Sequence, residues 1–309
     1  MTLDDAIRSG LSSRPLRLPS ALFYDALGSQ LFEAITLLPE YEVSRTGMRL
    51  LRAHAAEMVA LPGEVEILEL GPGGGANARI LVEALRLRQE RVRFVGVDVS
   101  QDALTACRRA LEEIPGVTAL GVCGDYLDGL RRAATFRSPG ARLLVPFLGS
   151  NLSNFARADA KEFLGSVREA LRPRDVLLLA ADLEKPPERL LPAYDDSLGV
   201  TAAFNKNALA RLNREWEADF DLGAFAHEAR WNAGERRIEM HLRATSAQEI
   251  HVGKLGLRFA MEAGETIWTE SSHRFRLDEL QEWGEGAGFR WCGAWVDESW
   301  PFAQCLLEA

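Results

Sequence analysis

The feature that most limits the fold of this chain is a series of mainly apolar, non-alternating segments that are separated by helical patterns, beginning near residue 65. The apolar segments are "VEILELG", "RFVGVDVS", "VTALGVCGD", "ARLLVPFLGS" and "DVLLLAADL". Continuous apolarity indicates strands of a parallel sheet that is covered on both faces, because such strands meet no water on either side. Helical patterns between them, joined by short loops, predict a doubly wound α/β sheet.

A different pattern follows residue 184. The segments "RRIEMHLRAT" and "QEIHVGKLGLRFAM" alternate apolar and polar residues, and "GETIWTESSHRF" continues this pattern, which is typical of antiparallel strands with one face in water. A helical segment and two strands, "FRWCGAWVD" and "FAQCLLEA", then close the chain. We therefore expect two domains: the α/β sheet over residues 46–184 plus 275–309, and a second unit over residues 1–45 plus 185–274.

Composition excludes several classes of protein. The net charge is -9, which argues against nucleic acid as a partner, because such binding relies on clustered Lys and Arg. No apolar run approaches the ~20 residues of a membrane span, so no membrane partner is expected. The four cysteines lack CxxC spacing and the five histidines lack HxH or HExxH spacing, so no metal site is expected. We expect a cytoplasmic protein with free thiols, and a monomer.

The first apolar strand ends in a glycine-rich turn, "EILELGPGGGANARIL", in which Gly71, Gly73 and Gly75 follow Glu69. Glycine allows positive φ and a close approach of the backbone to a ligand. The helix N-terminus beyond the turn favours an anionic group. Because Gly71, Gly73 and Ala76 also satisfy G-x-G-x-x-A, the turn alone leaves open a nicotinamide dinucleotide, another cofactor or a tight turn without a ligand.

Two acids follow the next strands. Asp98 ends the second strand, where a carboxylate can accept hydrogen bonds from ribose hydroxyls. In "CGDY", Asp125 and Tyr126 follow the third strand, where an acidic and an aromatic residue can meet an adenine ring. The simpler alternatives are a surface acid for Asp98 and a helix N-cap for Asp125.

Together with the two closing strands, the glycine turn and these acids resemble the class I S-adenosylmethionine-dependent methyltransferases. The resemblance implies a mostly parallel, seven-stranded Rossmann-like methyltransferase sheet and S-adenosylmethionine as co-substrate. In that family the glycine loop faces the amino-acid half of the cofactor, the second-strand acid holds the ribose, and the acid after the third strand reaches adenine. The implied cofactor-binding residues are Gly71, Gly73, Asn77, Asp98, Asp125 and Tyr126.

Several longer stretches carry a narrower resemblance: "FYDALGSQLFEAITLLPEYEVSRTGMRLL", "FLGSNLSNF", "AYDDSLGVTAAFNKNAL", "RIEMHLRA" and "TESSHRF". From about residue 15 to its end, the chain is similar to the histidine-specific Nα-methyltransferases of ergothioneine biosynthesis. The resemblance implies that free L-histidine is bound with the help of a smaller α+β domain. It also implies that three methyl groups are added to the α-amino nitrogen, giving hercynine.

The resemblance also implies roles for individual residues around the amino acid. Tyr41 and Asn154 would hold the substrate near its reacting nitrogen, and Tyr24 would lie near the amine. These three are the implied catalytic residues. Asn154 has a simpler alternative as the cap of a helix that starts near Arg157.

The remaining implied residues bind the rest of the substrate. Tyr194 would bind the carboxylate, and Gly149 belongs to the same substrate-binding set. Glu270 and Ser272 would hydrogen-bond the imidazole, and Met240 would pack against its ring. A carboxylate that accepts one N–H and a hydroxyl that meets the other nitrogen suit an imidazole better than an indole.

One departure from the family lies in the glycine loop, where Asn77 stands at a position that is commonly lysine. Any charged contact at that position with the cofactor carboxylate would be lost or replaced. Three alternatives remain open from the sequence: a related enzyme that acts on another amino acid or amine, one that acts on a prenylated tryptophan, or a catalytically silent homologue that binds a small molecule.

Overall fold

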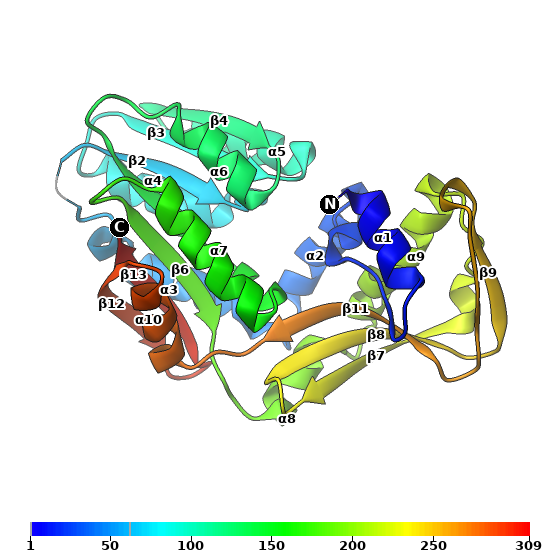
Figure 1. Cartoon of the computed structure of the whole chain (residues 1–309). Coiled ribbons are helices and arrows are strands. Elements are labelled where there is room, and N and C mark those ends of the chain that lie inside the picture. The colour runs from blue at the N-terminus through cyan, green and yellow to red at the C-terminus, as the bar shows by residue number, and fades with distance from the viewer. Residues whose placement is uncertain (1, 62) are drawn as a thin grey trace. The chain divides into compact units, whose positions relative to one another are not determined.

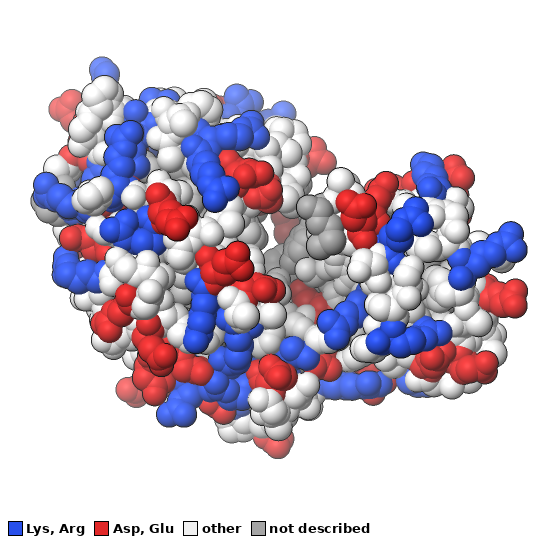
Figure 2. Space-filling view, viewed as in Figure 1, with Lys and Arg blue, Asp and Glu red and all other residues white. Residues whose placement is uncertain are grey.

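The computed structural model describes residues 2–61 and 63–309 (Figure 1). The chain divides into two compact units. Unit 1 contains Met1–Glu42 and Lys185–His273, and unit 2 contains Val43–Glu184 and Arg274–Ala309. On the face of each unit that Figure 2 shows, acidic and basic side chains are interspersed.

Unit 2 is built on a sheet of seven strands, in the order β12-β13-β6-β5-β2-β3-β4. Neighbouring strands are parallel, except that β13 runs antiparallel to both β12 and β6. The strands are β2 (Val65–Leu70), β3 (Val92–Asp98), β4 (Val117–Cys123), β5 (Arg142–Phe147), β6 (Val176–Asp182), β12 (Arg290–Asp297) and β13 (Phe302–Glu308). This topology confirms the mostly parallel seven-stranded sheet and the closing antiparallel hairpin that the sequence predicts.

Every residue of the central strands β2, β5 and β6 is buried, which agrees with their continuous apolarity. The helices of unit 2 are α3 (Glu42–Met58), α4 (Ala76–Arg86), α5 (Gln101–Glu112), α6 (Tyr126–Ala134), α7 (Arg157–Ala170) and α10 (Leu277–Gly286). Buried side chains of α6, α7 and α10, such as Leu130, Phe163 and Leu280, form one core with the sheet. In Figure 1, α6 and α7 lie in front of this sheet, and α3 and α4 lie behind it.

Unit 1 contains a four-stranded sheet in the order β1-β11-β8-β7 and a separate hairpin of β9 and β10. The strands are β1 (Leu16–Arg17), β7 (Phe225–Asn232), β8 (Arg237–Ala244), β9 (Gln248–Val252), β10 (Leu257–Met261) and β11 (Thr266–His273). Its helices are α1 (Leu3–Leu11), α2 (Ala26–Leu37), the single turn α8 (Pro187–Leu190) and α9 (Val200–Glu215). The sequence predicts the strands corresponding to β8–β11, whereas β7 and the two-residue β1 are not among the expected elements.

The two faces of the unit 1 sheet differ in character. Along β8, Ile238, Met240, Leu242 and Ala244 are buried on one face, and α9 contacts β7 and β8. We call this the inner face. Charged residues of β8 alternate with these positions and occupy the opposite, outer face, as the period of two in a strand requires. Among residues 2–61 and 63–309, no helix is long and apolar enough to cross a membrane.

Candidate functional site

Four neighbouring strands of unit 2 end at one edge of its sheet, and the predicted cofactor-binding residues follow them. The glycine turn comes after β2, Asp98 ends β3, and Asp125 and Tyr126 come after β4. The loop with Gly149 and Asn154 comes after β5, which lies beside β2. The fold therefore brings these residues to the carboxyl ends of parallel strands, where open α/β sheets bind their ligands.

A backbone hydrogen bond fixes the glycine turn to the end of β3. Gly71 and Gly73 have φ values of +73° and +52°, which favour glycine. The Gly71 N–H donates to the Val97 carbonyl at 2.8 Å. A Cβ on Gly71 would lie 3.1 Å from the Asn151 amide nitrogen and 3.4 Å from the Tyr126 ring. The turn therefore requires glycine at this position, both for its backbone conformation and for the space beside it.

Asp98 ties this turn to the end of β3. Its Oδ2 accepts a hydrogen bond from the Gly73 N–H at 3.3 Å, and its Oδ1 accepts one from the Ser100 N–H at 2.9 Å. Burial raises the pKa of the Asp98 carboxyl, and the backbone N–H groups partly oppose this shift. Asp98 is thus a half-buried acid that organises the loop, in contrast to the surface acid that was the simpler alternative.

Glu69 is a further acid at this edge that the sequence analysis did not assign to the site. The residue is 1% exposed, and its Oε2 has no hydrogen-bond partner in the described part of the chain. Burial, followed by the charge of Asp98, raises the pKa of Glu69 to about 8. The sequence signal that could have assigned Glu69 to this site is its position as the acid of the E-x-G-x-G-x-G pattern. A neutral carboxyl therefore lies behind the glycine turn near physiological pH.

We expect the Glu69→Gln variant to lose part of the pH dependence of folding stability. An acid whose pKa is higher in the folded state binds its proton more tightly there. Its stabilising effect is complete below the unfolded pKa near 4.5 and is lost as pH rises through about 8. Between pH 5.5 and 8.5 the wild type should lose about 3 kcal/mol more unfolding free energy than Glu69→Gln.

Urea unfolding of both proteins at the two pH values measures this difference. The titrating groups that do not interact with Glu69 are common to the two proteins, so their contributions cancel. Parallel pH profiles for the two proteins would show that Glu69 titrates in its ordinary range.

Asp125 has the local role that the simpler alternative predicts. Its Oδ1 accepts hydrogen bonds from the backbone N–H groups of Leu127 and Asp128, at 3.1 and 2.9 Å, and so caps α6. Tyr126, the first residue of that helix, packs edge-on against Phe147. Burial raises the pKa of the Tyr126 phenol, so this hydroxyl beside Gly71 stays protonated. A contact of Asp125 with adenine stays a prediction.

The loop after β5 carries Gly149 and Asn154. Gly149 and Ser150 both have positive φ, and Ser150 Oγ accepts a hydrogen bond from the Asp182 backbone N–H at 2.8 Å. This bond fixes the loop to the end of β6. Asn154 does not cap α7, because the N-cap residue of α7 is Ala156. Asn77, the departure in the glycine loop, lies half-buried in the first turn of α4.

In unit 1 the three predicted tyrosines belong to one aromatic cluster. The rings of Tyr41 and Tyr194 meet edge-on, with centroids 6.5 Å apart. Phe32 contacts both Tyr24 and Tyr41, with centroid distances of 6.1 and 6.2 Å. The Tyr194 hydroxyl lies 2.7 Å from Ser272 Oγ, at hydrogen-bond distance. Tyr194 thus connects this aromatic cluster to Ser272, near the end of β11.

The residues predicted to hold the imidazole share the inner face of the unit 1 sheet. Glu270 of β11 pairs directly with Met240 of β8, and Ser272 pairs with Ile238. Directly paired residues of antiparallel strands project to the same side. Met240 and Ile238 are buried on the inner face, so Glu270 and Ser272 lie on that face as well.

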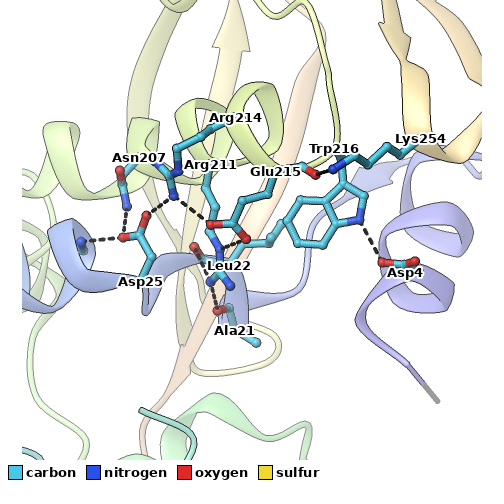
Figure 3. A network of polar contacts seen from close by, with 11 residues as sticks. Asp4, Ala21, Leu22, Asp25, Asn207, Arg211, Arg214, Glu215, Trp216 and Lys254 are labelled. Carbon is cyan, nitrogen blue, oxygen red and sulfur yellow. Dashed lines mark hydrogen bonds and ion pairs between the residues drawn. The ribbon is translucent and has the colours of Figure 1, made fainter. Parts of the chain in front are cut away.

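A polar network anchors the segment that carries Tyr24 to α9 (Figure 3). Asp25, the next residue, caps α2 by accepting the Gly28 N–H at 2.7 Å. The same carboxylate accepts hydrogen bonds from Asn207 at 2.8 Å and from Arg214 at 2.6 Å. Because both partners belong to α9, this network fixes the position of Tyr24 relative to the helix that covers the inner face.

The described residues contain no group of three or more His, Cys, Asp or Glu that could hold a metal ion. All four cysteines are free thiols. The polar side chains that the sequence predicts for cofactor and substrate carry carboxylate, hydroxyl and amide groups, which orient ligands by hydrogen bonding.

Comparison with known proteins adds independent findings. Residues 3–309 match the family described as "Histidine-specific methyltransferase, SAM-dependent". The chain is 43% identical over 301 residues to the histidine N-alpha-methyltransferase of Mycolicibacterium smegmatis, covering 97% of this chain and 92% of that protein. It is 42% identical to the histidine N-alpha-methyltransferase of Mycobacterium tuberculosis, again over 97% of this chain and 92% of that protein. The ergothioneine biosynthesis protein 1 of Neurospora crassa is 29% identical over 88% of this chain and 32% of its own length.

Proposed function

Because the chain belongs to the family of histidine-specific, S-adenosylmethionine-dependent methyltransferases, we propose that it transfers three methyl groups from S-adenosylmethionine to the α-amino nitrogen of L-histidine, giving hercynine for ergothioneine biosynthesis. The observation that carries the proposal is the 43% identity to a histidine N-alpha-methyltransferase over 97% of the chain. For its setting we propose a monomer in the cytoplasm, where four free thiols persist.

The loops at the carboxyl edge of the unit 2 sheet supply the groups that such a cofactor needs. Asp98 would accept hydrogen bonds from the ribose hydroxyls, and the backbone of Gly71 and Gly73 would face the methionine half. The space at Gly71, which a Cβ would crowd, fits this role. Asn77 would replace the charged contact of a lysine with amide hydrogen bonds, and Tyr126 would lie beside the loop as a neutral hydroxyl.

Unit 1 supplies groups that match L-histidine. Glu270 would accept a hydrogen bond from one imidazole N–H, Ser272 would meet the other ring nitrogen, and Met240 would pack on the ring. The Tyr194 hydroxyl, already at hydrogen-bond distance from Ser272, would bind the carboxylate. A pocket of this kind disfavours side chains that lack these partners, because its buried polar groups would then be unpaired.

The chemistry is an in-line displacement at the methyl carbon. In each transfer the amine lone pair forms the N–CH₃ bond while the CH₃–S bond breaks, and the sulfonium becomes a neutral thioether. The nitrogen loses a proton before each of the three transfers, because free histidine carries an α-ammonium group at neutral pH, and the three protons are released to solvent. After the third transfer the nitrogen has no lone pair, so methylation stops there. The protein contributes mainly by alignment of nitrogen, carbon and sulfur.

Neutral side chains are suited to this alignment. We assign the orientation of the amine to Tyr24, Tyr41 and Asn154, with Gly149 in the same loop as Asn154. Hydroxyl and amide groups orient the amine by hydrogen bonds without holding it as an ammonium ion, which would have no lone pair for attack.

The test is incubation of the purified protein with S-adenosylmethionine and each of the twenty amino acids, followed by mass analysis of the products. We expect three methyl groups on histidine and little product from the others. Methylation of another amino acid alone would assign a different substrate. Tight binding of S-adenosylhomocysteine and histidine in calorimetry, without any turnover, would identify a catalytically silent homologue.

A further inference from the structure

The register of β11 is interrupted beside the proposed imidazole pocket. Trp268 pairs with His241, and the next pair is Glu270 with Met240, so Thr269 is an extra residue in a β-bulge. The rings of Trp268 and His241 stack on the outer face, with centroids 6.2 Å apart. Residues two positions apart in a regular strand share a face, yet Trp268 and Glu270 lie on opposite faces. The bulge therefore turns Glu270 and Ser272 to the inner face.

We propose that Thr269 is a positioning residue for histidine specificity, because its hydroxyl holds the bulge that aims Glu270 and Ser272 at the imidazole. The inference rests on the function proposed above. It adds a residue that is not expected to touch the substrate and that acts through its two neighbours.

The first support is the hydrogen bonding of Thr269 itself. The residue is 2% exposed, and its Oγ1 lies 2.7 Å from Asn205 Oδ1 and 3.0 Å from the Met240 carbonyl oxygen. Both partners are acceptors, so they share the single hydroxyl proton of Thr269 in a bifurcated hydrogen bond. One bond joins the bulge to the paired strand β8, and the other joins it to α9. The extra residue is thus fixed from two directions.

The second support is the orientation of Asn205, which is fully buried. Its Nδ2 donates to the His241 carbonyl oxygen at 3.1 Å and approaches His227 Nδ1 at 2.8 Å. A carbonyl oxygen only accepts, so the amide nitrogen must face His241 and the amide oxygen must face Thr269. The hydroxyl of Thr269 therefore meets an acceptor whose orientation is set by other contacts.

The same network extends to Tyr194. Because Asn205 donates to His227 Nδ1, the ring proton of His227 lies on Nε2, which donates to the Tyr194 carbonyl oxygen at 2.7 Å. The hydroxyl of Tyr194 then meets Ser272. The bulge and the tyrosine proposed to bind the carboxylate are thus connected by a chain of hydrogen bonds, and a break at one member leaves others unpaired.

The outer face restrains the same bulge independently. The Trp268 indole N–H donates to the Glu270 carbonyl oxygen at 2.8 Å. The guanidinium carbons of Arg17 and Arg237 each lie 4.4 Å from the centroid of the Trp268 ring. We expect these contacts to keep β11 paired with β8 when the hydroxyl of Thr269 is removed. Such a change should therefore alter the orientation of the Glu270 side chain without unfolding the strand.

The experiment compares three variants with the wild type. Thr269→Val keeps the shape and the strand preference but removes the hydroxyl, and Thr269→Ser restores it. Thr266→Val is the matched control, because it makes the same change on β11 at a residue that pairs with Arg243, outside the bulge. For each protein we would measure kcat and KM for histidine, the rates with other aromatic amino acids, and the affinity for S-adenosylhomocysteine by calorimetry.

We expect Thr269→Val to raise KM for histidine about 10-fold or more. The ratio of kcat/KM for histidine to kcat/KM for other aromatic amino acids should fall. The affinity for S-adenosylhomocysteine should not change. Thr269→Ser should lie near the wild type, and Thr266→Val should equal it. If the valine variant does not fold, Thr269→Ala is measured in its place with the same expectations.

Wild-type KM and selectivity in Thr269→Val would overturn the inference. An equal loss of cofactor affinity would also overturn it, since that result indicates general destabilisation. Absence of histidine methylation by the wild type would count against the proposed function instead. In that case the affinity for histidine, measured by calorimetry, tests the role of Thr269. Weaker histidine binding by Thr269→Val, with recovery in Thr269→Ser, would support this role. Failure of the wild type to bind histidine would reject it.

Discussion

Replacing Asp98 by alanine is expected to weaken binding of S-adenosylmethionine and S-adenosylhomocysteine by at least about 100-fold. The carboxylate has two functions in the proposed site. It would accept the ribose hydroxyls in charge-assisted hydrogen bonds, each worth about 1.5–3 kcal/mol. It also holds the Gly73 and Ser100 N–H groups, so its loss loosens the loop that faces the methionine half.

Calorimetric titration with S-adenosylhomocysteine measures this effect directly. Asp102→Ala removes the same charge from an exposed position in the first turn of α5, and its affinity should match the wild type. Asp98→Asn keeps the shape and one acceptor oxygen, so its loss should be intermediate. An affinity of Asp98→Ala within a few-fold of the wild type would remove Asp98 from the proposed cofactor site.

The second large effect is expected from the double variant Glu270→Ala and Met240→Val. Loss of the carboxylate removes the acceptor for the imidazole N–H, which should lower kcat/KM for histidine about 10- to 100-fold. The shorter side chain at 240 lies directly opposite on β8, so the two changes enlarge one continuous space. Bulkier aromatic amino acids should then become substrates.

The two single variants separate these contributions. Glu270→Ala alone should account for most of the loss with histidine, and Met240→Val alone should change histidine use by less. The control is Glu249→Ala, which removes a carboxylate from an exposed position of β9 in the same unit. Unchanged selectivity in the double variant would reject the assignment of the imidazole to Glu270.

Much of unit 2 is predictable because its signals are local. The five mainly apolar strands and the glycine turn lie where short-range patterns place them. Asp98 and the glycines reach one edge of the sheet because parallel strands bring their carboxyl ends together. The role of Asp125 as the cap of α6 was visible as an alternative, since a cap is read from the residues beside it.

Unit 1 was less predictable because its signals are long-range. Strand β7 escapes prediction because Phe225–Asn232 mixes polar, charged and apolar residues without clear alternation, and its pairing with β8 is seen only in the folded chain. Glu69 was visible in the sequence, but its raised pKa depends on complete burial beside Asp98.

The α/β class, the apolar strands and the glycine turn can be read from the sequence, because each depends on residues close together in the chain. The resemblance that named the substrate also needs no coordinates, since its stretches are matched residue by residue along nearly the whole chain. The direction in which Glu270 and Ser272 face is visible only in the folded chain. Their direction depends on one extra residue, Thr269, whose hydroxyl meets an amide 64 positions away, and pairing between such distant segments leaves no periodicity in the sequence.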